Sequence, residues 1–249
     1  MGHADYKRIV AGADTAVLFI HGILGTPNHF RELIPLEQLV TEDCSVYNIL
    51  LDGHGGNVDD FSNSSMTLWR QQVKNAFLDL ARTHDRVVIA AHSMGTLFAI
   101  QLGIEFSEKI PFLFLLGVPL RPWMRFSMAR DCLRMAFGKL PDGSVLHKAT
   151  GISPSPKIWK YIRWIPRYLE LFREIALTER MIKGLKIPCT AYQSGRDELV
   201  ANLTTGILKK MGVMSVHHLP NSTHFSYTES DAEQVCADFV RQLKEKSHD

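Results

Sequence analysis

The 249-residue sequence is poor in cysteine, carries little net charge and has no long apolar run. Its four cysteines form no CxxC pair and stand at no metal-ligand spacing with a histidine, so we expect reduced thiols and no metal site. The formal net charge of +2 is too small to indicate a nucleic-acid partner. No apolar run approaches the roughly 20 residues of a membrane-spanning helix. These absences predict a protein with no integral membrane segment and no nucleic acid among its partners.

The N-terminal part of the sequence also lacks the apolar core of a signal peptide, which predicts a cytoplasmic protein. Apolar residues make up 45% of the chain and charged residues 22%, the composition of an ordinary globular protein. Because α/β folds often reach this length as one unit, we expect a single domain over residues 1–249. The sequence does not indicate an oligomeric state.

Short apolar runs alternate with longer amphipathic stretches along most of the chain. Strands are predicted at 16–20, 45–51, 86–91, 112–117, 187–195 and 213–219. Helices are predicted at 29–41, 66–84 with Thr67 as N-cap, 94–106, 201–211 and 229–246. Continuous apolar strands that alternate with helices indicate a mostly parallel sheet covered by helices on both faces. In such sheets, functional loops lie at the carboxyl ends of the strands.

Residues 118–186 break this alternation, because they contain three of the four tryptophans, many basic residues and no convincing strand. We expect helices and loops inserted over the carboxyl edge of the sheet. Their apolar residues either face an apolar group of a substrate or pack the insertion onto the core (Trp123, Met124, Phe126, Met128, Met135 and Phe137). Their basic residues either form solvated helix faces or attract an anionic substrate or a membrane surface (Arg121, Arg125, Arg130, Arg134, Lys157, Lys160, Arg163, Arg167 and Arg173).

A candidate nucleophile lies where the strand predicted at 86–91 runs into a helix. The string there is AHSMG, in which Ser93 would occupy a sharp turn between small residues. Such a turn lifts the hydroxyl clear of the sheet. It also places the N–H of Met94 at a helix N-terminus, where it can stabilise an oxyanion.

A second turn, HGILG at 21–25, follows the first buried strand. Its glycines favour a tight turn that exposes the backbone, so the N–H of Ile23 can point into the same site as that of Met94. Two converging donors would form an oxyanion hole. We interpret His21 as a structural hydrogen-bonding residue rather than a base.

A serine hydroxyl needs a base, and the base needs a carboxylate that fixes its tautomer. His224 lies in NSTHF, between the last predicted strand and the last helix, and is the preferred base. His54, in the loop DGHGG, is its best rival. Asp197 lies in SGRDELV directly after a strand and is the preferred acid, with Glu198 as a possible substitute. Asp197 could also cap a helix.

The order Ser93, Asp197, His224 is the order of α/β-hydrolase triads. The sequence resembles an α/β-hydrolase of the carboxylesterase and monoacylglycerol-lipase type over nearly its whole length. HGILG resembles the oxyanion segment of that family, DGHGG its Pro-Gly-His-Gly loop, AHSMG its nucleophile elbow, GRDELV its acid loop and NSTHF its base loop. The chain departs from the family at Ala91, which replaces the first glycine of the elbow. We also expect one of the usual leading antiparallel strands to be missing or reduced to about 6–10.

The resemblance implies the α/β-hydrolase fold, with a helical cap formed by about 118–186. It also implies backbone oxyanion donors at Ile23 and Met94. We therefore expect a serine carboxylic-ester hydrolase that forms an acyl-enzyme on Ser93 and needs no cofactor. Its substrate would be a small ester with an apolar acyl or alcohol group. The same triad would serve a thioesterase, peptidase, lactonase or acyltransferase, and a ligand sensor with low turnover is a further alternative.

Overall fold

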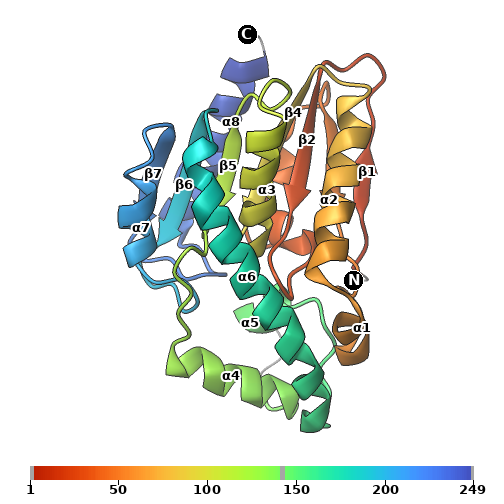
Figure 1. Ribbon diagram of the computed structural model, residues 1–249, viewed down its shortest axis with the longest axis vertical. Helices are drawn as coiled ribbons and strands as arrows, with labels where there is room; N and C mark the ends of the chain where they lie inside the picture. The colour runs from red at the N-terminus through yellow and green to blue at the C-terminus, as the bar shows by residue number, and fades with distance from the viewer. Residues whose placement is uncertain (1–2, 141–143, 248–249) are drawn as a thin grey trace.

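The computed structural model describes residues 3–140 and 144–247. At its centre is a seven-stranded sheet in the order β1-β3-β2-β4-β5-β6-β7 (Figure 1). The first strand pairs antiparallel with β3, and all the other neighbours are parallel. The prediction of a mostly parallel sheet is therefore confirmed. The strands are β1 (Tyr6–Arg8), β2 (Thr15–Ile20), β3 (Ser45–Ile49), β4 (Arg86–His92), β5 (Leu113–Leu116), β6 (Cys189–Ser194) and β7 (Met214–Leu219).

Helices cover both faces of the sheet, as predicted. One face carries α2 (Met66–Ala81), α3 (Met94–Glu105) and α6 (Ile165–Met181), and α8 (Glu229–Ser247) lies behind the sheet (Figure 1). Strand β2 shows why both layers are needed: Leu18 and Ile20 pack into the first core, whereas Val17 and Phe19 pack into the second. A strand that is apolar on both sides must be covered twice.

Three local predictions are wrong. The helix predicted at 29–41 is replaced by two 3-10 turns, η1 (Pro27–Phe30) and η2 (Glu37–Leu39). Pro35 explains the difference, because it has no N–H to donate and disfavours α-helical backbone in the residue before it. The N-cap of α2 is Ser65 rather than Thr67, since the Ser65 side chain accepts the N–H of Leu68.

The third difference follows the loop DGHGG, where the sequence predicts no helix. Helix α1 (Val58–Asn63) begins two residues after this loop. The Asn57 side chain accepts the N–H groups of Asp59 and Asp60, and the Asp60 carboxylate accepts the N–H of Asn57. This reciprocal capping box stabilises a helix that is too short to show a periodic apolar pattern.

The insertion predicted at 118–186 lies between β5 and β6, and residues 141–143 of it are outside the described part. Its helices are α4 (Phe126–Ala136), α5 (Val145–Ala149), η3 (Ile158–Trp164), α6 and η4 (Ile182–Gly184). Its described residues form no strand beyond isolated bridges, as predicted. In Figure 1, α4 and α5 lie below the sheet, away from the remaining helix α7 (Leu203–Leu208).

Candidate active site

Ser93 forms the turn between β4 and α3 by itself, because the strand ends at His92 and the helix begins at Met94. Its φ of 51° lies in the left-handed region that residues other than glycine rarely adopt. The surrounding backbone holds this conformation: the Ser93 N–H donates to Leu116 O at 2.8 Å, and the Thr96 N–H donates to Ser93 O at 2.9 Å. The predicted sharp turn is confirmed, and strained backbone of this kind is typical of functional sites.

Two glycines permit this turn. A Cβ atom at Gly95 would overlap the carbonyl oxygens of Ile20 and His21, so α3 can cross the end of β2 only without a side chain there. A Cβ atom at Gly22 would lie 2.8 Å from the Cβ of Ser93. The sequence pattern indicated the crowding at Gly95. The contact at Gly22 depends on the pairing of two strands and could not be derived from local sequence.

Ile23 and Met94, which carry the two predicted oxyanion donors, line one cavity together with Ser93. In the described chain, neither N–H donates a hydrogen bond to another protein group. The Met94 N–H is free because the first residues of a helix have no intrahelical acceptor. The turn at Ile23 is closed by a hydrogen bond from Gly25 N–H to Gly22 O at 3.0 Å, and Leu24 within it has a φ of 58°.

Asp197 and His224 form a buried pair. The Nδ1–H of His224 donates to Asp197 Oδ2 at 2.8 Å, and the side chains of His224 and Asp197 are only 1% and 2% exposed. The other carboxylate oxygen, Oδ1, accepts the N–H groups of Leu199 and Val200, each at 2.8 Å. Because Nδ1 carries the proton, Nε2 is the nitrogen that can act as a base.

The Nε2 atom of His224 is buried and has no hydrogen-bond partner among the described residues. The Ser93 hydroxyl therefore makes no hydrogen bond to it in this structure. The structure thus joins two of the three predicted triad residues directly. The third residue, Ser93, is close to this pair in the fold. The centroid of the His224 ring lies 4.7 Å from that of His92, the residue before Ser93, and the His224 ring packs against Gly117 at the end of β5. In unliganded sites, catalytic hydrogen bonds are often long and shorten when substrate binds.

Two contacts that the sequence did not predict fix the backbone of His224. Glu198, weighed above as a substitute acid, instead accepts the His224 N–H through its carboxylate at 3.0 Å. His92 donates from Nε2 to His224 O at 3.1 Å. Both contacts join segments far apart in sequence. The sequence hinted at these contacts only by placing Glu198 next to Asp197 and His92 next to Ser93.

The other candidate histidines are engaged elsewhere. His21 donates from Nδ1 to Gly22 O at 2.8 Å and accepts the Leu51 N–H at Nε2, which agrees with a structural role. His54 donates from Nδ1 to Asp52 O at 3.1 Å, and its ring lies 4.9 Å from that of Trp69. Neither of these histidines lines the cavity, and His224 does not line it either, so its pairing with Asp197 is what distinguishes it. Among the described residues, no group of three or more histidine, cysteine or acidic side chains could hold a metal ion.

Several buried histidines around the site are neutral. The ring of His29 stacks on His92 with centroids 3.7 Å apart. Burial, with smaller contributions from His224 and His21, lowers the pKa of His29 to about 3. Burial lowers the pKa of His54 to about 4. Burial and neighbouring histidines hold the pKa of His92 well below its usual range.

We expect these histidines to make the fold sensitive to acid. In the unfolded chain each binds a proton near pH 6.5, whereas in the folded chain His29 and His54 stay neutral until the pH approaches their lowered pKa values of about 3 and 4. Each should therefore lower the free energy of unfolding by about 1.4 kcal/mol for each pH unit below 6.5, down to about pH 4. Urea titrations across this range measure the slope.

The variants His54→Gln and His29→Gln should each remove the contribution of one proton to that slope, about 1.4 kcal/mol per pH unit. The double variant should remove the contribution of two. Full stability is expected above pH 6.5 in every case. A slope that is the same in the single and double variants as in the parent protein would contradict the prediction.

The cavity at Ser93 has a volume of about 220 Å³ and an almost wholly apolar lining. The loops at the sheet edge contribute Ile23, Leu24, Ser93, Met94, Leu199, Val200 and Phe225. The insertion contributes Pro119, Pro122, Trp123, Met124, Met128, Cys132, Met135, Leu146, Ala149, Thr150, Tyr168, Leu171, Phe172 and Ile175. Of the six apolar residues singled out in the sequence, Phe126 and Phe137 are absent from the lining and exposed.

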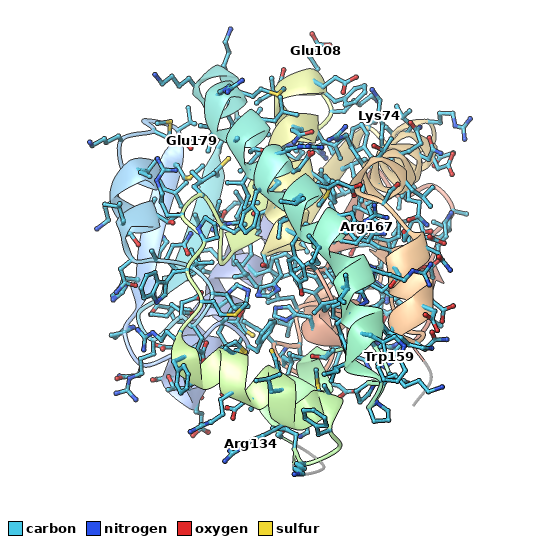
Figure 2. All side chains as sticks on the ribbon, turned by 60° about the horizontal axis from the view of Figure 1, so that its bottom comes forward. Lys74, Glu108, Arg134, Trp159, Arg167 and Glu179 are labelled. Atoms are coloured by element: carbon cyan, nitrogen blue, oxygen red, sulfur yellow. The ribbon has the colours of Figure 1, made fainter. Side chains whose placement is uncertain are left out.

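Backbone hydrogen bonds hold the insertion over the site. The Trp123 N–H donates to Leu199 O at 2.8 Å, beside the acid. The Gly151 N–H donates to Leu24 O at 2.8 Å, beside Ile23. Figure 2 turns the bottom of Figure 1 forward and shows α4 and α6 on this side of the molecule. The insertion thus supplies most of the apolar wall of a cavity that Ser93, Ile23 and Met94 also line.

Residues 17–238 match the model of the Alpha/beta hydrolase family. A search of curated proteins found no match. Among solved structures, the chain is similar to one reported for the metagenome-derived lipolytic enzymes LipS and LipT, at 19% identity and a TM-score of 0.72, covering 97% of this chain and 98% of that one.

Two further structures show the same fold. A monoacylglycerol lipase from Paleococcus ferrophilus is 16% identical, with a TM-score of 0.66 and coverage of 99% of this chain and 100% of that one. A thioesterase domain from the curacin biosynthetic pathway is also 16% identical, with a TM-score of 0.63 and coverage of 96% and 99%. At such identities the likeness concerns the fold alone.

Proposed function

Because the chain belongs to the Alpha/beta hydrolase family, we propose that it is a serine hydrolase that cleaves carboxylic esters through an acyl-enzyme on Ser93. Asp197 and His224 complete the proposed triad. The backbone N–H groups of Ile23 and Met94 form the proposed oxyanion hole.

The reaction follows from the positions of these groups. The Ser93 hydroxyl attacks the ester carbonyl while Nε2 of His224 takes its proton, and the carboxylate of Asp197 stabilises the imidazolium that forms. The two N–H groups stabilise the oxyanion of the tetrahedral intermediate. His224 then protonates the leaving alcohol. Water, activated by the same histidine, releases the acid from Ser93.

The observation that carries the proposal is the buried hydrogen bond between Asp197 and His224, with the opposite nitrogen of the ring left without a partner. A buried polar atom without a partner is costly in a structural role, because its desolvation is not offset. Nε2 of His54 is also buried without a partner among the described residues, but its Nδ1 donates to a backbone carbonyl and not to a carboxylate. The bond to Asp197 therefore supports a role for Nε2 of His224 in exchanging a proton with Ser93 and with the leaving group.

The apolar cavity supports a substrate with an apolar acyl or alcohol group, since few polar atoms of its lining could bind a polar one. We propose that residues 118–186 act as a helical cap on a single catalytic domain. Thioester, lactone and amide hydrolysis and acyl transfer use the same groups and differ only in the leaving group or the acceptor. A ligand sensor with low turnover would keep the cavity but not the reactivity of Ser93.

The test is a panel of p-nitrophenyl esters from acetate to dodecanoate, with one thioester and one aminoacyl amide. We expect ester turnover that rises from acetate to longer acyl chains, because the cavity favours apolar groups. A fluorophosphonate probe should label Ser93 in the folded protein, as mass spectrometry would show. Folded protein with neither turnover nor labelling would overturn the proposal and favour a sensor.

A further inference from the structure

The charge of the chain is divided very unevenly. Residues 118–186 contain 14 basic and 5 acidic residues, a net charge of +9, whereas the 14 basic and 21 acidic residues of the remaining chain give −7. The ion pairs on α4 do not neutralise this excess, because Arg130 and Arg134 share the single carboxylate of Asp131. Arg125 beside them is exposed and has no ion pair among the described residues. The insertion is thus a cationic lobe on an acidic body.

Helix α4 is apolar on two opposite sides. Met128, Cys132 and Met135 face the cavity. On the other side of the helix, Phe126, Leu133 and Phe137 are 85%, 59% and 50% exposed. Spacings of seven and four residues place these three side chains in one stripe, with Arg130 between them. A helix of a soluble protein normally turns only one apolar face inward, so the outer stripe of α4 lacks a partner.

The same end of the molecule carries further exposed apolar groups. Trp159, in η3, is 62% exposed, and Figure 2 shows it and Arg134 on the side that α4 occupies. The cavity opens here as well, because Trp123 and Met124 belong to its lining and are nevertheless 60% and 56% exposed. The exposed stripe and the entrance to the cavity therefore share one surface.

We propose that this surface, formed by Phe126, Leu133, Phe137 and Trp159 with the cations Arg130 and Arg134, docks on an anionic lipid bilayer. No described helix is both long and apolar enough to cross a membrane, so the contact is peripheral. Aromatic and aliphatic side chains enter the boundary between headgroups and acyl chains, and the arginines attract the anionic headgroups. If the proposed esterase function holds, an apolar substrate would pass from the bilayer into the cavity without crossing water.

The charge of the lobe favours a bilayer over a second copy of the chain. Two copies that met through this stripe would bring Arg130 and Arg134 of both copies together with only one paired carboxylate in each copy, and like charges at close range oppose association. An anionic lipid surface complements the charge and accepts the exposed apolar groups at the same time.

Co-sedimentation with vesicles tests the inference without reference to catalysis. The intact protein should bind vesicles of phosphatidylcholine mixed with phosphatidylglycerol at least about tenfold more tightly than vesicles of phosphatidylcholine alone, and added salt should weaken the binding. The charge variant Arg130→Gln with Arg134→Gln should lose about tenfold in affinity for the anionic vesicles. The apolar variant Phe126→Ser with Phe137→Ser should lose binding at low and at high salt.

Each variant has a matched control on the body of the protein. Lys209→Gln with Lys210→Gln removes two exposed cations beyond the lobe, and Leu68→Ser with Leu78→Ser removes two exposed apolar side chains from α2. Both controls should bind like the parent protein. None of the changed side chains lines the cavity, so hydrolysis of a water-soluble short ester should be unaffected in all four variants.

Equal losses in the lobe variants and the controls, or no binding to anionic vesicles at low salt, would overturn the inference. So would a dimer in light scattering that the apolar variant alone converts to a monomer, because the stripe would then be an interface between copies. These outcomes are separate from the proposed function. A protein that hydrolyses soluble esters but ignores vesicles loses only the docking surface, and one that binds vesicles without turnover loses only the esterase assignment.

Discussion

Replacement of Ser93 by alanine should lower kcat on p-nitrophenyl butyrate by about 10⁵-fold, because the acyl group then has no nucleophile to receive it. The remaining rate would come from the oxyanion donors and from binding alone. The fold should survive, since the Ser93 side chain makes no capping hydrogen bond to α3 and the alanine methyl fits where the Cβ already lies. Circular dichroism and thermal melting would establish that the variant is folded, and fluorophosphonate labelling should disappear with activity.

Ser64→Ala provides the control for this experiment. Ser64 is also buried, its hydroxyl has no hydrogen-bond partner among the described residues, and it does not line the cavity. This variant should keep the kcat and the labelling of the parent protein. Activity that persists in Ser93→Ala would place the chemistry on another residue.

Asp197→Asn should lower kcat by about 10⁴-fold with little change in shape. The neutral amide cannot stabilise the charged imidazolium, and it favours the tautomer that leaves a proton on the wrong ring nitrogen. The loop around residue 197 should keep its conformation, because the amide oxygen can still accept the N–H groups of Leu199 and Val200 that Oδ1 accepts now. The loss of kcat should therefore come from the chemistry and not from a change in the loop.

The neighbouring residue offers a matched comparison. Glu198→Gln makes the same chemical change one position further, but the glutamine oxygen can still accept the His224 N–H that the carboxylate accepts now. We expect a loss of less than about tenfold, because only backbone positioning is touched. If Glu198→Gln cost as much as Asp197→Asn, the acid would have been assigned to the wrong carboxylate.

The sequence predicted the parallel sheet because each of its core strands is short, continuous and apolar on both sides. It failed where a local breaker outweighed a periodic pattern, as at Pro35, which divides the helix predicted at 29–41 into two 3-10 turns. It failed again at α1, where a capping box at Asn57 stabilises a helix of six residues. Such elements depend on side-chain-to-backbone hydrogen bonds, which periodicity does not report.

The candidate residues of the site could be named from the sequence, but the contacts that hold them in place could not. Ser93, Asp197 and His224 each follow a strand, so a parallel sheet alone gathers them at one edge. The roles of Gly22 against Ser93 and of His92 and Glu198 on the backbone of His224 require the folded chain. The insertion shows the same limit, because Met128 and Phe126 look alike in sequence although one faces the cavity and the other faces outward.

The two parts of the site come from different parts of the chain. The reactive groups follow the strands of the sheet, whereas most of the cavity wall comes from residues 118–186, a single stretch between β5 and β6. Mutations or exchanges within that stretch can reshape the cavity while the geometry around Ser93 stays fixed. Under the proposed function, selectivity and reactivity would therefore be encoded in separate parts of the chain, and a new substrate range could arise by remodelling one contiguous segment.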